Sequence, residues 1–367
     1  MKIQDTYIQQ VRAALWGGEA AWPADQSGLY MRMHAMQGTG PLVFPGLLEN
    51  KYLPADARMQ MKGVCLSTMQ QQVRIGHVFA QAWTAMEKTG IRPVLMKGAG
   101  LAALYPEVQM RTWGDIDLFV GKDQYHPACA VMRETFPDAL KFDEELDHYK
   151  HYNLIADGIS IEIHRVTVGL QHPVDERRYA RMEHDGMANS EPLDVNGLTV
   201  RVPEPTFNAL FVFMHSWEHM MTKGANIRQL CDLALLLHHY RDRIDRARLG
   251  KWLKALHLFD VWQVYMSILA DGLGLPSEEA LFYDRSDRIT QRSTRLFHDL
   301  LKGVMVAPEP DKKAPKNRLL RKAHTMRERL RNAQRIRRYS PEFARHMVAE
   351  TMLHGALRFF AKDRHWE

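Results

Sequence analysis

The fold is decided by residues 94–120, which read VLMKGAGLAALYPEVQMRTWGDIDLFV. The apolar run that begins at Val94 predicts a short strand, and a glycine-containing turn follows it. A second strand is predicted after Gly114, and it carries Asp115 and Asp117. Because alternate side chains of a strand share a face, both carboxylates project together while the residues between them anchor the strand. Paired carboxylates repel unless a cation lies between them, so this strand predicts a site for a hard divalent ion; the alternative is two solvated aspartates near a turn.

The composition is that of an ordinary globular protein. The chain has 367 residues, of which 46% are hydrophobic and 25% charged, and this length allows two or three domains. The three cysteines, Cys65, Cys129 and Cys231, are widely spaced and odd in number, which favours buried thiols in a reducing cytoplasm over a disulfide framework. No signal peptide or membrane-spanning run is expected, and we predict a cytoplasmic protein.

Apolar periodicity divides the chain into four predicted regions. Residues 1–90 read as helices, and residues 91–205 read as an α/β core. Residues 206–306 read as a helical C-terminal domain, and 307–367 as a basic helical tail. The expected fold class is therefore α+β, with a minimal mixed sheet flanked by helical regions.

Two hairpins are predicted inside the α/β core. Asp157-Gly158 and Asn196-Gly197 each separate two short apolar runs, and such pairs accept the positive φ angles of a tight turn. In the strand after Asp157-Gly158, Glu162 and His164 alternate with isoleucines that face the other way. Glu162 is thus expected as a third carboxylate beside the two aspartates, and His164 as a further residue lining the site.

The turn between the first two strands has the composition of a phosphate-binding loop. Gly98 and Gly100 allow the backbone to approach a phosphate closely, and Lys97 and Arg111 supply positive charge for its oxygens. A glycine turn, two aspartates and a third carboxylate are what phosphoryl transfer through two metal ions requires.

These residues, with others further along the chain, resemble a known family. The segments that carry the resemblance are Leu95-Met96-Lys97-Gly98, Leu101, Tyr105-Pro106, Arg111, Gly114-Asp115-Ile116-Asp117-Leu118-Phe119-Val120, Ile161-Glu162-Ile163-His164, Phe213-Met214-His215, His219 and Arg228-Gln229-Leu230-Cys231-Asp232-Leu233. Over residues 60–240 the chain is similar to the uncharacterised nucleotidyltransferase family of the DNA polymerase β-like superfamily.

The resemblance implies roles for particular residues. It implies metal-binding and catalytic roles for Asp115, Asp117 and Glu162, and a phosphate-contacting loop at Lys97 and Gly98. The wider superfamily usually has serine or a second glycine directly after the first loop glycine. Here Ala99 stands at that position and offers only its backbone N–H.

The predicted activity is therefore transfer of a nucleoside monophosphate from an NTP to an acceptor hydroxyl or phosphate, with release of pyrophosphate. Mg²⁺ is the expected ion and Mn²⁺ the alternative, with NTP as substrate. The competing prediction is a module that keeps the fold, has lost turnover and binds nucleic acid.

Two histidine patterns suggest other metals. His215-Ser216-Trp217-Glu218-His219 matches the H-x-x-E-H pattern of inverted zinc peptidases, for which Glu278 or Glu279 would supply the further acidic ligand. His148, His151 and His164 lie around the first hairpin and could hold a transition metal. We favour packing for His215 and His219, with substrate contact as an alternative for His215, and a polar cleft wall for the other three.

Positive charge is concentrated near the C-terminus. Between Lys312 and Arg338 there are twelve lysines or arginines and one acid, Glu328, so the rest of the chain is net acidic although the whole carries +6. A helix with an arginine-rich face is predicted there. This face is either solvated or bound to RNA or DNA, with RNA as the acceptor, and an anionic membrane surface is the lesser alternative. The arginines proposed for RNA are Arg321, Arg327, Arg331 and Arg335.

Overall fold

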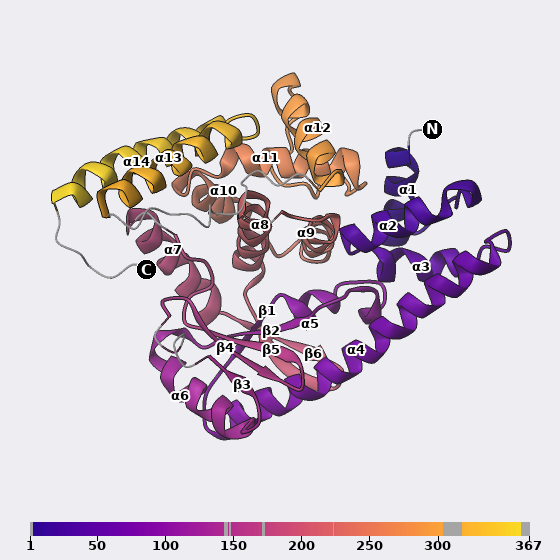
Figure 1. Cartoon of the computed structure of the whole chain (residues 1–367), viewed down its shortest axis with the longest axis horizontal. Helices are drawn as coiled ribbons and strands as arrows, with labels where there is room; N and C mark the ends of the chain where they lie inside the picture. Colours follow the sequence, from indigo (N-terminus) through magenta and orange to yellow (C-terminus); the bar gives the residue numbers. More distant parts are fainter. Residues whose placement is uncertain are drawn as a thin grey trace.

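The computed structural model describes residues 3–142, 146, 148–170, 173–222, 224–303 and 318–360. A five-stranded sheet lies in the lower part of Figure 1. Its strands are β1 (Val94–Met96), β2 (Asp115–Phe119), β3 (Leu140–Lys141), β4 (His151–Ala156) and β5 (Ile159–His164), in the order β1-β2-β5-β4-β3. Strands β2 and β5 are parallel and the other neighbouring pairs of this sheet are antiparallel. The predicted α+β class with a mixed sheet is confirmed.

The two faces of the sheet differ because side chains alternate along each strand. The apolar face presents the fully buried side chains of Ile116, Leu118, Leu154, Ile161 and Ile163. It packs against the long helix α4 (Ala55–Lys88) and against α6 (Gly121–Thr135), which lie below the sheet in Figure 1. The opposite face carries Asp115, Asp117, Glu162 and His164. Burial of one face therefore fixes the direction in which the acidic side chains point.

Two tight turns set the register of the hairpins. Asp157 and Gly158 have φ angles of 51° and 74° between β4 and β5. Asn196 and Gly197 have φ angles of 54° and 81°. They join β6 (Glu191–Val195) to β7 (Leu198–Val202), which form a separate two-stranded sheet. Both predicted hairpins are confirmed.

A helical body lies above the polar face of the sheet in Figure 1. Its helices are α1 (Ile3–Trp16), α2 (Ser27–Gln37), α3 (Gly40–Leu48), α8 (Pro205–Thr222), α9 (Ile227–His239), α10 (Arg246–Ala255), α11 (Phe259–Ser267) and α12 (Asp287–Leu301). These helices share one apolar core although they come from both ends of the chain. For example, the indole N–H of Trp16 donates to the Leu273 carbonyl at 2.7 Å. The two expected helical regions thus form one packed body.

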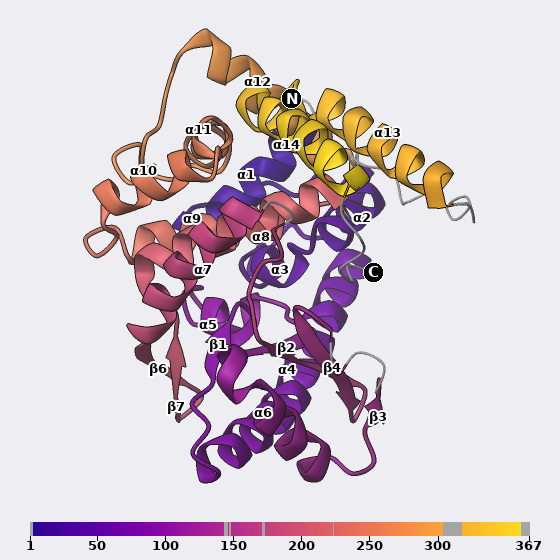
Figure 2. The ribbon, with the colours of Figure 1, turned by 90° about the vertical axis from the view of Figure 1, so that its left-hand side faces the viewer.

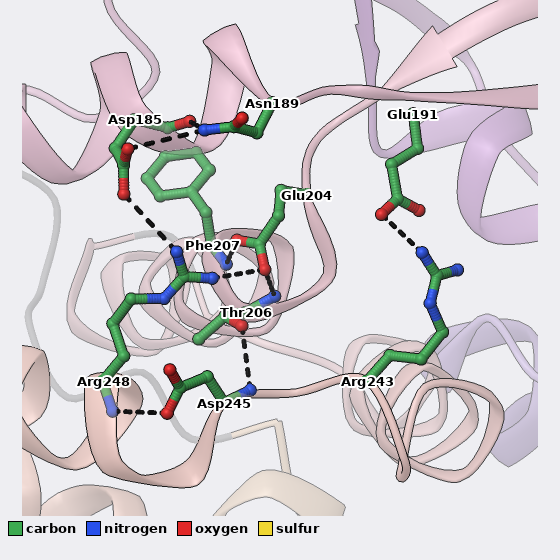
Figure 3. A network of polar contacts seen from close by, with 9 residues as sticks. All are labelled: Asp185, Asn189, Glu191, Glu204, Thr206, Phe207, Arg243, Asp245 and Arg248. Carbon is green, nitrogen blue, oxygen red and sulfur yellow. Dashed lines mark hydrogen bonds and ion pairs between the residues drawn. The ribbon is translucent and has the colours of Figure 1, made fainter.

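Arg248 joins three elements that support α8 (Figure 3). Its guanidinium on α10 contacts Asp185 of α7 (Pro173–Ala188) at 3.4 Å and also contacts Glu204. The Glu204 carboxylate accepts the N–H groups of Thr206 and Phe207, each at 3.1 Å. These bonds satisfy backbone donors in the first turn of α8, which have no partner inside the helix. The network holds α8 in position over the sheet.

The basic segment forms a helix, as predicted. It is α13 (Arg318–Ile336), which pairs with α14 (Pro341–Phe360) at the upper right of Figure 2. Ser340 donates to the Asp260 carboxylate at 2.5 Å and ties the turn between these helices to α11. The linker expected at 307–315 lies outside the described residues. The domain boundaries remain predictions.

Local signals did not reveal every element. Helix α6 begins at Gly121 and contains Pro127, so this proline does not mark the start of the helix. Helix α7 was not predicted: its buried apolar residues Tyr179, Met182 and Met187 are sparse among charged ones. Within the described residues, none of the helices combines the length and the apolar character that a membrane crossing would need.

Candidate active site

Three carboxylates meet on the polar face of β2 and β5. Asp117 is opposite Glu162 in the parallel ladder, and Asp115 precedes Asp117 by two residues. One oxygen from each side chain lies within 4.8 Å of the other two. Asp117 is fully buried, whereas Asp115 and Glu162 are half-buried. The three acidic residues expected from the sequence are therefore close enough together to share a cation.

Lys97 brings a positive charge to this cluster. Its Nζ atom lies 3.0 Å from Asp117 Oδ1. Its backbone has φ 52° and ψ −136°, a region that a residue with a Cβ rarely adopts, and Gly98 follows with φ 40°. A Cβ on Gly98 would lie 3.3 Å from the Trp113 ring, so a larger residue would also be crowded. This strained turn positions the lysine over the carboxylates.

His164 links two of the carboxylates. Its Nε2 atom lies 3.1 Å from both Asp117 Oδ1 and Glu162 Oε2. Burial alone would lower the pKa of His164, but its hydrogen bonds to these two acids outweigh burial and raise the pKa. The imidazole is thus held in a position where its protonated form balances the acidic charge.

The three carboxylates have different pKa values. Burial raises the pKa of Asp117, but Lys97 and His164 outweigh it and hold the pKa below its usual range. The negative charge of Asp117, followed by burial, raises the pKa of Asp115. The hydrogen bond from His164 outweighs burial and lowers the pKa of Glu162. Asp117 is therefore a carboxylate of the cluster that stays negatively charged, while Asp115 takes up a proton more readily.

Arg111 is held by Asp232 of α9. Its Nε and Nη2 atoms donate to the two Asp232 oxygens at 2.6 and 2.9 Å, and Nη1 donates to the Gly98 carbonyl at 3.0 Å. The Tyr105 hydroxyl donates to the same carboxylate at 2.8 Å. The sequence suggested that Arg111 grips the triphosphate. In the structure its charge is matched by Asp232, and its contact with Gly98 holds the glycine turn.

The two residues that follow Gly98 pack inward. Ala99 is 1% exposed, and a Cβ on Gly100 would lie 3.3 Å from Val202. Lys97 and Gly98 line the cleft described next, whereas Ala99 and Gly100 do not. Close packing against β7 accounts for the small residue at position 100.

A cleft of about 320 Å³ separates the acidic face of the sheet from α8 and α9. His215 and His219 of α8 line it, with ring centroids 4.4 Å apart. Burial, followed by the nearby Lys97, lowers the pKa of His215 well below its usual value, so this ring is neutral. Lys150 and Arg228 add positive charge to the walls. The cleft is therefore polar, with acids on one wall and cations around them.

Arg228 differs from the other cations of the cleft. Its Nη1 atom donates to the Thr112 carbonyl at 2.6 Å, and within the described part of the chain no carboxylate lies within ion-pair distance of it. Burial, and then the neighbouring Arg111, lower its pKa. An arginine in this setting fits an incoming anion. In the sequence, Arg228 stands out only as part of a segment that carries the family resemblance, and that resemblance predicts no role for it.

The acidic cluster fits a hard divalent cation. Asp117 Oδ2 is buried and has no hydrogen-bond partner among the residues that the structure describes. A buried carboxylate oxygen without a partner is costly, and coordination of a cation would satisfy it. Carboxylate oxygens are the ligands that Mg²⁺ and Mn²⁺ take. Asp115, Asp117 and Glu162 would hold the ion.

The other histidine patterns find less support. For His215 and His219, the described residues bring no third ligand atom into reach, and Glu279 instead contacts His238 at 2.7 Å. His151 lies 4.0 Å from Glu162, and burial lowers the pKa of His151 to about 4. His151 and His164 line the cleft, and with Glu162 they bring ligand atoms within 4.8 Å of one another. Their role as a polar wall rather than as metal ligands stays a prediction.

Fold and site together define a class of protein. A mixed sheet with three clustered carboxylates beside a strained glycine turn is suited to transferring phosphoryl-type groups. A family model described as uncharacterised nucleotidyltransferase matches residues 23–273. The chain belongs to this family, and the resemblance noted from the motifs is confirmed.

Other comparisons add little. A search of curated proteins found no match. Among solved structures, the chain is similar to an antigenic nucleotidyltransferase-like protein from Paracoccidioides brasiliensis. The sequence identity is 14% and the TM-score is 0.33, and the match covers 57% of this chain and 96% of that one.

Proposed function

We propose that this protein is a Mg²⁺-dependent nucleotidyltransferase that moves a nucleoside monophosphate from an NTP to an acceptor hydroxyl or phosphate. The observation that carries the proposal is the pairing of Asp117 with Glu162 across β2 and β5, which brings three carboxylates within 4.8 Å of one another. A divalent ion held by these carboxylates would neutralise the triphosphate and activate the acceptor oxygen. Mn²⁺ is the alternative ion.

The cations of the cleft would bind the triphosphate. Gly98 has no side chain and lets phosphate approach the turn, while Lys97 and Arg228 supply the positive charge. Arg111 is a positioning residue in this proposal, because it holds the Gly98 carbonyl at 3.0 Å. Asp232 keeps Arg111 in place.

The acceptor would enter from the side of α8. Its oxygen forms a bond to the α-phosphorus while the bond from that phosphorus to the β-phosphate bridging oxygen breaks, and pyrophosphate leaves. Glu162 takes the proton when the acceptor is a hydroxyl. The neutral ring of His215 lines the same cleft and would contact the substrate.

Cys65, Cys129 and Cys231 are free thiols, which suits the cytoplasmic location proposed for the reaction.

The first test is thermal stability with each NTP, with and without Mg²⁺. Stabilisation that needs both ligands and is lost in Asp115→Asn supports the proposal. The matched control is Asp242→Asn, because the Asp242 side chain is 85% exposed. Equal NTP stabilisation in Asp115→Asn and the parent protein contradicts the proposal.

The second test measures transfer itself. The protein is incubated with α-labelled NTPs and fractionated cell extract, and the labelled fraction identifies the acceptor. Asp117→Asn should lower transfer by about 100-fold or more, the scale seen when one electrostatic stabiliser is removed. Transfer that continues at the parent rate in EDTA or in Asp117→Asn would rule out the mechanism.

The second candidate function is binding of RNA without turnover. It is favoured by Arg327, Arg331 and Arg335, which are exposed on α13; the side chain of Arg321 lies outside the described part. Glu328 pairs with Arg331 at 2.8 Å. RNA that stabilises the parent and Asp115→Asn equally, in the absence of any NTP effect, would favour this function. Its binding should weaken steeply with salt.

A further inference from the structure

A second group of metal-ligating side chains lies away from the acidic cleft. Asp175 comes from the first turn of α7, His257 follows α10, and His346 comes from α14. One ligand atom from each lies within 4.8 Å of the other two. Three segments distant in the sequence thus bring one carboxylate and two imidazoles to one point between the body and the C-terminal helix pair.

The contacts inside this group are short. His346 Nε2 lies 2.6 Å from Asp175 Oδ2 and 3.0 Å from Glu350 Oε1. The rings of His257 and His346 stack with centroids 4.0 Å apart. Asp175 is only 5% exposed, so its carboxylate has little access to water. Glu350, one turn after His346 on α14, contacts the same nitrogen and would become a fourth ligand by turning its side chain toward the other three.

Neighbouring charges hold these ligands in place. Arg178 Nη1 lies 3.1 Å from Asp175 Oδ1, while Oδ2 faces His346. Glu342 Oε1 lies 3.9 Å from His257 Nδ1. Outer partners of this kind orient metal-binding carboxylates and histidines in known sites. A salt bridge between Asp175 and His346 alone does not require the second imidazole that His257 brings.

We propose that Asp175, His257 and His346 bind a zinc-class divalent ion, with Glu350 as the fourth ligand. Two imidazoles and two carboxylates are a tetrahedral donor set that suits Zn²⁺, while Mg²⁺ takes oxygen ligands. The ion joins α14 to α7 and to the turn after α10. This site is separate from the proposed reaction and adds a structural link to the C-terminal helices.

The test uses the full-length chain in a Glu162→Gln background. Glu162 belongs to the carboxylate cluster and also to a group with His151 and His164 whose ligand atoms lie within 4.8 Å of one another, so this change weakens zinc binding in the cleft. Chelator-treated protein is titrated with Zn²⁺ by calorimetry, and thermal stability is followed in parallel. We expect one equivalent to bind and raise the melting temperature.

Two variants and a control locate the ion. His257→Ala and His346→Ala should each weaken Zn²⁺ binding by about 100-fold or more, above the 10- to 100-fold loss that outer partners cause. The control is His184→Ala, an exposed histidine of α7, which should bind as the parent does. The proposal is overturned if His257→Ala binds Zn²⁺ as tightly as the Glu162→Gln protein that carries no other change. It is also overturned if that Glu162→Gln protein binds no Zn²⁺.

Cobalt absorption of the Glu162→Gln protein is a readout that does not require the histidine variants to fold. Co²⁺ in the Glu162→Gln protein should give the intense visible absorption of tetrahedral coordination with nitrogen and oxygen ligands, and Zn²⁺ should displace it. Weak absorption typical of six-coordinate cobalt overturns the assignment. Cobalt absorption that survives in a folded His257→Ala protein also overturns it.

Discussion

Arg228 places a positive charge on the cleft wall beside the glycine turn. Because no carboxylate of the described residues pairs with it, its guanidinium is available for a phosphate. Arg228→Ala should raise the KM for NTP by about 10- to 100-fold, the scale of a hydrogen bond to a charged group. Steady-state kinetics measure this. Arg228→Lys keeps the positive charge but loses the planar guanidinium, so its KM should lie between those of the parent protein and Arg228→Ala.

The KM and the melting temperature, taken together, separate a binding role of Arg228 from a structural one. A change in KM with an unaltered melting temperature places Arg228 at the triphosphate. An unchanged KM in Arg228→Ala would remove it from the site. Arg32→Ala offers a comparison at an exposed arginine of α2 outside the cleft.

The acidic residues could be found from the sequence because they follow strand periodicity. Asp115 and Asp117 alternate with buried Ile116 and Leu118, and Glu162 alternates with buried isoleucines in the same way. The partner of Arg111 could not be found in this manner. Asp232 lies 121 residues away on a helix of the body, and only tertiary packing brings the two side chains together.

Elements pack by local fit, and Gly186 shows this between α7 and α8. A Cβ at this position would lie 2.2 Å from the Phe207 Cβ, so one of the two helices would have to move. Gly186→Ala should therefore destabilise the protein by about 1–3 kcal/mol or more, as overpacked cores do. Urea unfolding measures the difference.

The control for this prediction is another glycine inside a helix, at a position where an added Cβ would meet no neighbouring atom. Gly76 lies inside α4 and a Cβ there would have nothing within 4 Å. Gly76→Ala should stabilise by about 0.5–1 kcal/mol because alanine loses less entropy in a helix. Equal effects at positions 76 and 186 would contradict the packing argument.

His34 joins α1, α2 and the start of α3 through hydrogen bonds. Its ring nitrogens lie 2.9 Å from Gln10 Oε1 and 2.9 Å from Thr39 Oγ1. Burial lowers the pKa of His34 to about 3. The unfolded chain, with an ordinary histidine pKa near 6.5, takes up the proton first as pH falls. The stability linked to His34 is thus complete above pH 6.5 and is lost between pH 6.5 and about 3.

This linkage predicts a difference between two variants. Over that pH range His34 should contribute a slope of up to about 1.4 kcal/mol per pH unit to the free energy of unfolding. His34→Gln, which does not titrate, should have a flatter profile than the parent in chemical unfolding at several pH values. His184→Gln, at an exposed position, should keep the parent slope. A parent-like slope in His34→Gln would contradict the burial argument.

The elements themselves differ in how far the sequence revealed them. Asp157-Gly158 and Asn196-Gly197 determine their own φ angles, so the hairpins were visible locally. Helix α7 was not, because its buried side chains gain their meaning only against α8, as the contact of Gly186 with Phe207 illustrates. The pairing of β2 with β5 likewise depends on a connection through α6 and the first hairpin.

At the scale of the whole molecule, the described residues form two apolar cores. One lies between the sheet and α4, and the other fills the helical body. Arg111, just before β2, and Asp232 of α9 join the two parts by a bidentate ion pair in which both side chains are 5% exposed. The same arginine holds the Gly98 carbonyl, so this pair couples the stability of the interface to the shape of the glycine turn.

Breaking this pair from one side should be severe. Arg111→Met leaves the Asp232 charge buried without its partner, which costs about 3–5 kcal/mol in comparable buried pairs. Asp232→Leu leaves the Arg111 charge buried without its partner in the same way. The double variant removes both charges and should be less destabilised than the sum of the two, so that a double-mutant cycle by urea unfolding gives a favourable coupling energy.

An exposed pair sets the scale for this cycle. Arg331 and Glu328 lie 2.8 Å apart on α13 with side chains 50% and 31% exposed, and Arg331→Met should change stability by at most about 1 kcal/mol. If the effects of Arg111→Met and Asp232→Leu simply add, the two residues do not act as a unit and the proposed link between interface and turn is wrong. If they couple, the double variant should still lose NTP-dependent stabilisation, because the Gly98 carbonyl has lost the donor that holds the turn beside the carboxylates.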